Sequence, residues 1–312
     1  MAKLNVYITH WVASSDDFGY LRRMFNEILR LGIEKHQVVG VPHLVHPLFT
    51  QLFCLGQLTI DQLEITIVAN REPRFSAAEI LRVAGRPESS TKIRTEVVDI
   101  SNLRNPFEMT WIHKKFLSLD VSNSDQDDLF LYIEHDQLFT QRNLDYFILN
   151  SKSVQNLGIR PSFMRVELSS GNSGWVFSDA SSPISVQKSS AFVCGQRHWI
   201  ENPVPYAGMY LFNQADAKIH LTSHSFDIVQ SKERFEKFGV SERAALGNAF
   251  ERIEEASSAL GRRVSTTNFV PLKINEDSWD EGCFVWHFSN RYGMNQTAAR
   301  IRKYGSIPIS TD

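Results

Sequence analysis

The stretch that most constrains the fold is an apolar run that ends abruptly in charge. The apolar residues 129–133 precede three ionisable ones, Glu134, His135 and Asp136. An unbroken apolar run of this kind is typical of a strand buried on both faces, as in a mostly parallel sheet covered by helices. Three ionisable side chains in succession are costly inside a core. We therefore expect the strand to end here, at an edge of the sheet.

The first half of the chain alternates segments of strand and helix character. Residue periodicity predicts strands at 3–10, 63–70, 91–101 and 129–136, and helices at 14–32, 77–83 and 105–120. Asn105-Pro106 marks the start of the last helix, because proline at a first helical position loses no hydrogen bond. The apolar segment 38–60 has no clear period and receives no assignment.

The second half is more mixed. Strands are expected at 160–168, 207–213 and 282–290, and helices at 241–260, with Ser241 as N-cap, and at 295–305. A serine- and glycine-rich stretch, 169–182, has the composition of a loop. The order of elements predicts one α/β domain, a central mixed, mostly parallel sheet flanked by helices. Its two halves would be residues 1–140 and 141–312.

Composition excludes several other classes of protein. With 312 residues, 42% of them hydrophobic, the chain can bury a large core. A net charge of −2 with no basic block argues against nucleic acid as a partner. Three dispersed cysteines form no C-x-x-C pair, which argues against a zinc ribbon. We find no signal peptide and no apolar run of membrane-spanning length, so a cytoplasmic protein is expected, with peripheral membrane association left open.

The carboxyl end of the 129–136 strand is a candidate metal site. Ligands of open α/β sheets bind at the carboxyl ends of the strands. Two carboxylates one residue apart, Glu134 and Asp136, suit Mg²⁺ or Mn²⁺, which prefer oxygen ligands. The alternative is that these residues begin a solvated loop, where charge is common.

An apolar strand that ends in acid-x-acid after an α/β half-domain resembles the GT-A class of nucleotide-sugar glycosyltransferases. Glu134-His135-Asp136 matches the signature of that class, with His135 in its variable middle position. The resemblance implies a GT-A-like fold, in which residues 1–140 form a Rossmann-like half that binds the nucleotide sugar and residues 141–312 form the acceptor-binding and C-terminal half. Mn²⁺ or Mg²⁺ would be held on the diphosphate of the nucleotide-sugar donor. It also implies His287 as a third metal ligand, although a histidine between Trp286 and Phe288 is equally typical of a core.

The resemblance assigns further donor contacts to three places in the chain: His113 and Lys114, Tyr206 and Gly208, and Asn290 and Arg291. The first pair would contact the nucleoside, the second would lie under the sugars, and the third would face phosphate. Arg300 and Arg302 would add positive charge. The sequence departs from the pattern in having Glu rather than Asp first. Only Asp16 and Asp17 supply an acid near the first strand.

The activity implied by the resemblance is transfer of a sugar to a saccharide or glycoconjugate acceptor, as in polysaccharide or surface glycan synthesis. Inversion of configuration, which is slightly favoured, requires a carboxylate base. Glu242 is the first candidate and Glu167 the second. A retaining enzyme needs no such base. The loop 169–182, which contains Trp175, is either a lid over the donor or a plain surface loop.

Other classes remain as alternatives. A nucleotidyltransferase that makes sugar nucleotides would carry a basic, glycine-rich loop after the first strand, which residues 10–20 lack. A dinucleotide-dependent oxidoreductase would need G-x-G-x-x-G after a strand, and none is found. A metal-dependent hydrolase would cluster more His and Asp near Glu134. A catalytically inactive GT-A-like binding protein would be expected to lose the acids, and both are present.

Overall fold

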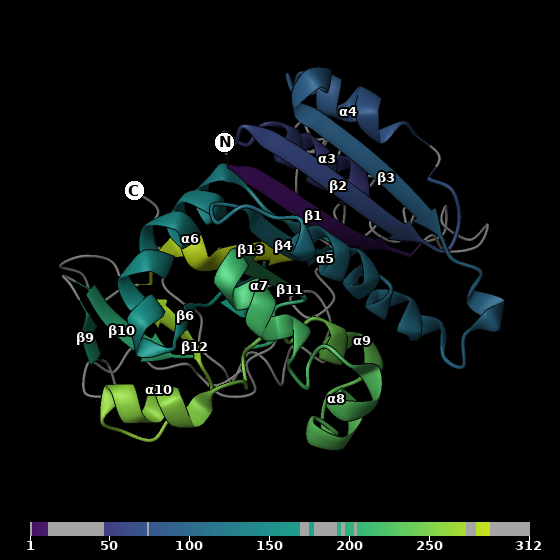
Figure 1. Cartoon of the computed structure of the whole chain (residues 1–312). Coiled ribbons are helices and arrows are strands. Elements are labelled where there is room, and N and C mark those ends of the chain that lie inside the picture. The colour runs from purple at the N-terminus through teal and green to yellow at the C-terminus, as the bar shows by residue number, and fades with distance from the viewer. Residues whose placement is uncertain are drawn as a thin grey trace.

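A five-stranded sheet forms the centre of the molecule. The computed structural model describes residues 2–11, 47–73, 75–168, 175–177, 192–194, 197–202, 205–272 and 279–287, with only the backbone at 168 and 175–177. The strand order is β11–β4–β1–β2–β3 (Figure 1). Its strands are β1 Lys3–His10, β2 Gln62–Ala69, β3 Thr91–Val97, β4 Leu129–Glu134 and β11 Met209–Asn213. Four strands are parallel, and β11 is antiparallel to β4.

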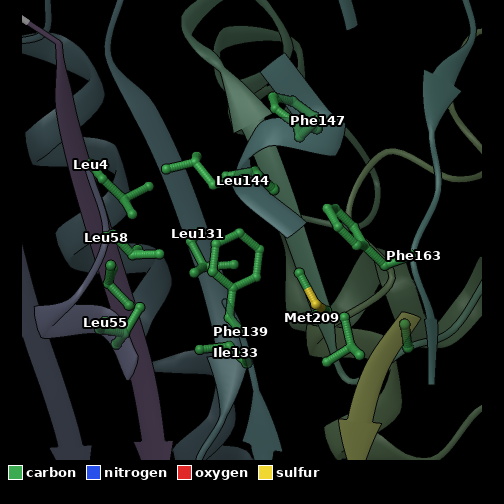
Figure 2. Close-up of a cluster of buried hydrophobic side chains, with 14 of the residues drawn as sticks. Leu4, Leu55, Leu58, Leu131, Ile133, Phe139, Leu144, Phe147, Phe163 and Met209 are labelled. Atoms are coloured by element: carbon green, nitrogen blue, oxygen red, sulfur yellow. The ribbon is translucent and has the colours of Figure 1, made fainter. Parts of the chain in front are cut away.

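Strand β4 is buried on both faces, which confirms the expectation from its apolar run. Leu131 and Ile133 belong to one core cluster, together with side chains of the helices α3 (Pro47–Gly56), α4 (Ala77–Val83) and α6 (Gln141–Val154) (Figure 2). Phe130 and Tyr132 belong to a second cluster, with side chains of α5 (His113–Ser122) and α7 (Gln214–Leu221). Because successive strand residues point to opposite faces, one apolar run fills two cores.

Two smaller sheets extend the central one. The first has the order β5–β13–β7–β8, with β5 Gln137–Leu138, β13 Phe284–His287, β7 Met164–Leu168 and β8 Trp175–Phe177. The second has the order β6–β12–β10–β9, with β6 Arg160–Pro161, β12 Asn268–Pro271, β10 Arg197–Glu201 and β9 Phe192–Cys194. Strand β5 begins three residues after β4 ends. The first of these sheets therefore starts at the edge of the central sheet where Glu134 and Asp136 lie.

Most first-half predictions are confirmed. The strands at 3–10 and 63–70 and the helix at 77–83 are present, and the third strand ends at Val97. Pro106 opens a 3₁₀ helix, Pro106–Trp111, that leads into α5, and Asn105 Oδ1 accepts the Phe107 N–H at 3.0 Å. The unassigned segment contains α3. The predicted helices at 14–32 and 295–305 lie outside the described residues.

The single helix predicted at 241–260 is wrong. The chain forms α9 (Val240–Ala244) and α10 (Ile253–Leu260), with turns between them, and Gly239 rather than Ser241 is the N-cap. Gly247 explains the break, because its φ is +56° and a Cβ there would lie 2.9 Å from Phe212 Cζ. The chain passes so closely over β11 that a regular helix with side chains cannot follow that path.

Other second-half predictions are modified. The 160–168 segment contains two strands, β6 and β7, and the late strand starts at Phe284 after a 3₁₀ turn. Part of the expected loop 169–182 is the strand β8. Helices α6, α7 and α8 (Ile228–Arg234) were not predicted. Among the described residues, no helix is both long and apolar enough to span a membrane.

Candidate functional site

A pocket lies where the strand order of the central sheet reverses. From β1 the sheet continues to β2 and β3 on one side, and β4 lies on the other side of β1. The crevice outside the carboxyl ends of two such strands is the usual ligand site of open α/β sheets. A cavity of about 280 Å³ occupies this place. Its wall includes Glu134, Asp136, Arg165, Tyr206, Glu242 and His287.

Strand pairing brings His287 between two carboxylates. The register of β13 places His287 opposite Gln137 of β5, next to Asp136. On its other side β13 runs parallel to β7, with Trp286 opposite Val166, so His287 lies alongside Glu167. His287 Nε2 is 3.0 Å from Asp136 Oδ2, and its Nδ1 hydrogen-bonds to Glu167 Oε1. Asp136 lines the pocket, whereas Glu167 is completely buried behind the imidazole.

The two carboxylates favour a charged imidazole. Burial alone would lower the pKa of His287, but the negative charge of Asp136 and the hydrogen bonds to Asp136 and Glu167 outweigh it and raise that pKa to about 9. Burial would likewise raise the pKa of Asp136, yet the attraction and hydrogen bond of His287 hold it well below its usual range. At neutral pH the metal-free arrangement therefore pairs a charged His287 imidazole with the Asp136 carboxylate.

The donor set at this place fits a hard or borderline divalent cation. Asp136 supplies oxygen and His287 supplies an imidazole nitrogen, a combination that suits Mn²⁺. Metal-bound histidines usually donate their other ring N–H to a carboxylate, and Glu167 occupies that position. Glu134 is the remaining expected metal ligand, and its Oε1 lies 3.3 Å from the Tyr206 hydroxyl oxygen. The described residues contain no group of three or more His, Cys, Asp or Glu gathered at metal-binding distances.

Tyr206 and Gly208 lie beside Glu134. The Tyr206 hydroxyl donates to the Glu134 carboxylate, and its ring lines the pocket. Gly208 has a φ of +64°, and a Cβ there would lie 1.9 Å from Gln137 Nε2 and 2.9 Å from Glu134 Oε2. Gly208 was expected to allow the close approach of a ligand. The structure shows that a glycine is already required at this position, because the side chains of Gln137 and Glu134 pack against its backbone.

Glu242 lies in the wall of the pocket and Glu167 does not. The Glu242 Oε2 atom accepts the Gly239 N–H at 2.7 Å, which fixes the carboxylate at the start of α9. That helix is tied to the 3₁₀ helix after β3, since Trp111 Nε1 donates to Val240 O at 2.9 Å. Of the two carboxylates expected as bases, only Glu242 therefore lines the pocket.

His113 and Lys114 lie in the core and do not line the pocket. His113 stacks on Tyr132 with ring centroids 4.0 Å apart, and its Nε2 is 2.7 Å from the Tyr210 hydroxyl. Burial and the charge of Lys114 hold the pKa of His113 well below its usual value. The Lys114 ammonium bonds to Ser225 O, and burial lowers its pKa strongly. The structure gives both side chains a role in packing.

His135 does reach the pocket. Its Nδ1 is 3.3 Å from Thr9 O, and its ring meets His10 edge-on with centroids 4.8 Å apart. The remaining predicted site residues, Asn290 and Arg291, lie outside the described residues, as do Asp16, Asp17, Arg300 and Arg302. Of the loop 169–182, only the backbone of 175–177 is described.

Sequence reasoning missed several pocket residues, among them Arg165, Trp11 and Phe107. Arg165 is the second residue of β7, and its only signal was one cation in an otherwise apolar segment, "FMRV". Trp11 and Phe107 form a tilted ring pair, with centroids 6.3 Å apart, at the pocket. They are 37% and 59% exposed, unusually open for large aromatic side chains, and nothing in their local sequence pattern indicates that they meet.

Comparison with known proteins gives no independent indication of function. No protein-family model matches the chain, and no curated protein matches its sequence. The geometry of this pocket is therefore the basis for proposing a function.

Proposed function

We propose that the chain is a metal-dependent glycosyltransferase that moves a sugar from a nucleotide-sugar donor to a saccharide or glycoconjugate acceptor. The observation that carries the proposal is the position of Glu134 and Asp136. Glu134 is the last residue of β4 and Asp136 lies in the turn after it, at the reversal of strand order, and both share one pocket with His287 and Glu242. A polar crevice at this point of an α/β sheet, with paired acids and a further carboxylate, suits a phosphorylated ligand and an acid–base step.

Asp136 and His287 would hold Mn²⁺ or Mg²⁺, with Glu134 as the third ligand. A bound divalent cation supplies positive charge that stabilises a leaving diphosphate. The chain's own contribution is to set its donors in place. Glu167 holds the His287 ring so that Nε2 faces Asp136, and Tyr206 holds Glu134. His287 must lose its proton before it can bind a metal, so cation binding would release a proton.

Glu242 would act as the general base. Its Oε2 is engaged by the Gly239 N–H, which orients the carboxylate and leaves Oε1 to accept a proton from the acceptor hydroxyl. Since inversion of configuration requires a general base for the acceptor, the presence of Glu242 in the pocket wall favours inversion. Glu167 is assigned no proton transfer, because His287 separates it from the pocket.

Thermal unfolding in the presence of sugar nucleotides tests the proposal. A panel of UDP- and GDP-sugars should raise the melting temperature only when Mn²⁺ is present, because a ligand that binds the native state stabilises it. Product analysis with saccharide acceptors then tests for transfer. No shift with any donor, with or without metal, would contradict the proposal. A shift with nucleoside triphosphates and sugar phosphates would favour a nucleotidyltransferase. Donor binding without turnover would favour an inactive binding protein.

A further inference from the structure

Arg165 is a buried cation in the wall of the pocket. It is the second residue of β7, where it pairs with Val285 of β13, and it is only 7% exposed. Placing a charged side chain in such a position is costly unless the charge has partners or a function. Arg165 and Glu167 lie on the same face of β7, because side chains two residues apart on a strand point the same way. Glu167 is directed at His287, whereas Arg165 opens to the cavity.

The guanidinium of Arg165 is positioned by an aromatic ring. Its Cζ lies 5.1 Å from the centre of the Tyr206 ring, and Tyr206 in turn donates its hydroxyl to Glu134. A cation–π contact of this kind attracts the guanidinium to the ring face and helps to fix its position in the pocket wall. The positive charge of Arg165 also acts on Asp136 and His287, which places it in the same electrostatic environment as the candidate metal ligands.

The negative and positive side chains of the pocket would interact with phosphate in different ways. Carboxylates repel phosphate, so Glu134 and Asp136 can meet a diphosphate only through a bound cation. A guanidinium is always charged and presents a planar fork of N–H donors that matches phosphate oxygens. We propose that Arg165 binds the phosphate groups of the ligand directly, so that the pocket recognises a diphosphate through two separate positive elements, this guanidinium and the metal. This inference rests on the proposed function and specifies the ligand's anionic group.

Titration with inorganic pyrophosphate tests the inference, by calorimetry in EDTA and again in Mn²⁺. Arg165→Gln should weaken binding by about tenfold or more in both conditions, the loss expected for hydrogen bonds to a charged group. Asp136→Asn should abolish only the gain that Mn²⁺ provides. Arg142→Gln is the matched control, because Arg142 is a largely exposed arginine on α6, paired with Glu281 away from the pocket wall. It should bind pyrophosphate as the wild type does.

Wild-type affinity in Arg165→Gln, in both conditions, would overturn the inference. If Asp136→Asn still removed the metal-dependent gain, the proposed function would stand without it. An absence of pyrophosphate binding by the wild type in both conditions would overturn the inference as well, and the sugar-nucleotide panel would then decide the proposed function separately. Should Arg165→Gln fail to fold, as judged by circular dichroism, Arg165→Met decides. It keeps an unbranched apolar side chain and removes the charge, and wild-type affinity in that variant would equally overturn the inference.

Discussion

At the residue scale, His287 links the candidate site to the stability of the fold. The pKa of His287 is raised from 6.5 to about 9, so its contribution to stability is present below pH 6.5 and is lost as the pH rises through 9. Asp136 has a pKa lowered from 3.8, so its contribution is present above that pH and is lost as the pH falls through the lower, folded-state value. The pair therefore stabilises the metal-free protein most between about pH 4 and 6.5.

The first prediction concerns this pair. In EDTA, Asp136→Asn should lower the free energy of unfolding by about 1–2 kcal/mol more at pH 6 than at pH 9.5, because only at the lower pH is the imidazolium fully formed. Urea unfolding of both proteins at the two pH values measures the difference. If the loss of unfolding free energy in Asp136→Asn did not change with pH, Asp136 and His287 would not form a charged pair.

The second prediction separates the two carboxylates first expected as bases. Glu242→Gln should reduce kcat by about 100-fold or more, as for loss of a general base, with little change in donor affinity. The glutamine oxygen can still accept the Gly239 N–H, so α9 keeps its N-terminal hydrogen bond. Steady-state kinetics and donor titration provide the two readouts. Equal losses of kcat and donor affinity would point to a binding role for Glu242 instead.

The third prediction concerns Glu167. Replacing it with glutamine weakens the hold on the His287 ring, so affinity for Mn²⁺ should fall by about 10–100-fold. Activity should recover when Mn²⁺ is raised, which loss of a base would not allow. Calorimetric metal titration and activity as a function of Mn²⁺ concentration test this. If the activity of Glu167→Gln stayed low at saturating Mn²⁺, Glu167 would have a direct role in proton transfer instead.

At the scale of elements, the site depends on pairings that no local pattern encodes. The apolar run and its acids predicted β4 and the edge at which it ends. His287 reaches Asp136 only because the two-residue strand β5 pairs with β13, about 150 positions later in the chain. Short strands with one or two hydrogen-bonded positions have too few residues for a period, so the convergence of Asp136, His287 and Glu167 could not be predicted from sequence.

Helix prediction failed for two different physical reasons. Helix α6 had readable signals, since Thr140 caps it together with Asn143, and Leu144 and Phe147 lie at helical spacing on its buried face. The capping box has Asn143 at the position where Glu or Gln is usual, so the sequence lacks the ordinary signature of a helix start. The segment 241–260 has the opposite property. Its residues favour helix locally, but tertiary packing of Gly247 against Phe212 and Tyr210 overrides that preference.

The fourth prediction belongs to the start of β11 and has a matched control. Gly208 and Gly261 have nearly equal φ values, +64° and +63°, but a Cβ at 208 meets Gln137 and Glu134 whereas a Cβ at 261 meets nothing within 4 Å. Gly261→Ala should cost about 1 kcal/mol for the left-handed backbone alone. Gly208→Ala should cost clearly more and weaken Mn²⁺-dependent donor binding, because it displaces Glu134. Equal unfolding midpoints for the two variants would contradict this account.

At the scale of the whole molecule, the two halves of the sequence form one structural unit. Strand β11, from the second half, is hydrogen-bonded to β4 along its whole length (Figure 1). The largest core cluster joins Leu4 and Ile133 of the first half to Phe163 and Met209 of the second (Figure 2). The pocket likewise takes Glu134 from the end of β4 and Asp136 from the turn that follows, whereas Arg165, Glu242 and His287 come from beyond residue 140. The boundary expected at residue 140 therefore falls within one structural unit.

The final prediction follows from this shared core. The chain should unfold in one cooperative transition, with coincident urea curves from far-UV circular dichroism and tryptophan fluorescence, because neither half can bury its side of the cluster alone. A fragment of residues 1–140 would leave β4 as an exposed, apolar edge strand, which favours aggregation. It should show no cooperative transition by itself. Two separated transitions in the full chain, or a folded 1–140 fragment, would mean that the halves are independent domains. The candidate site would then lie at an interface able to open and close.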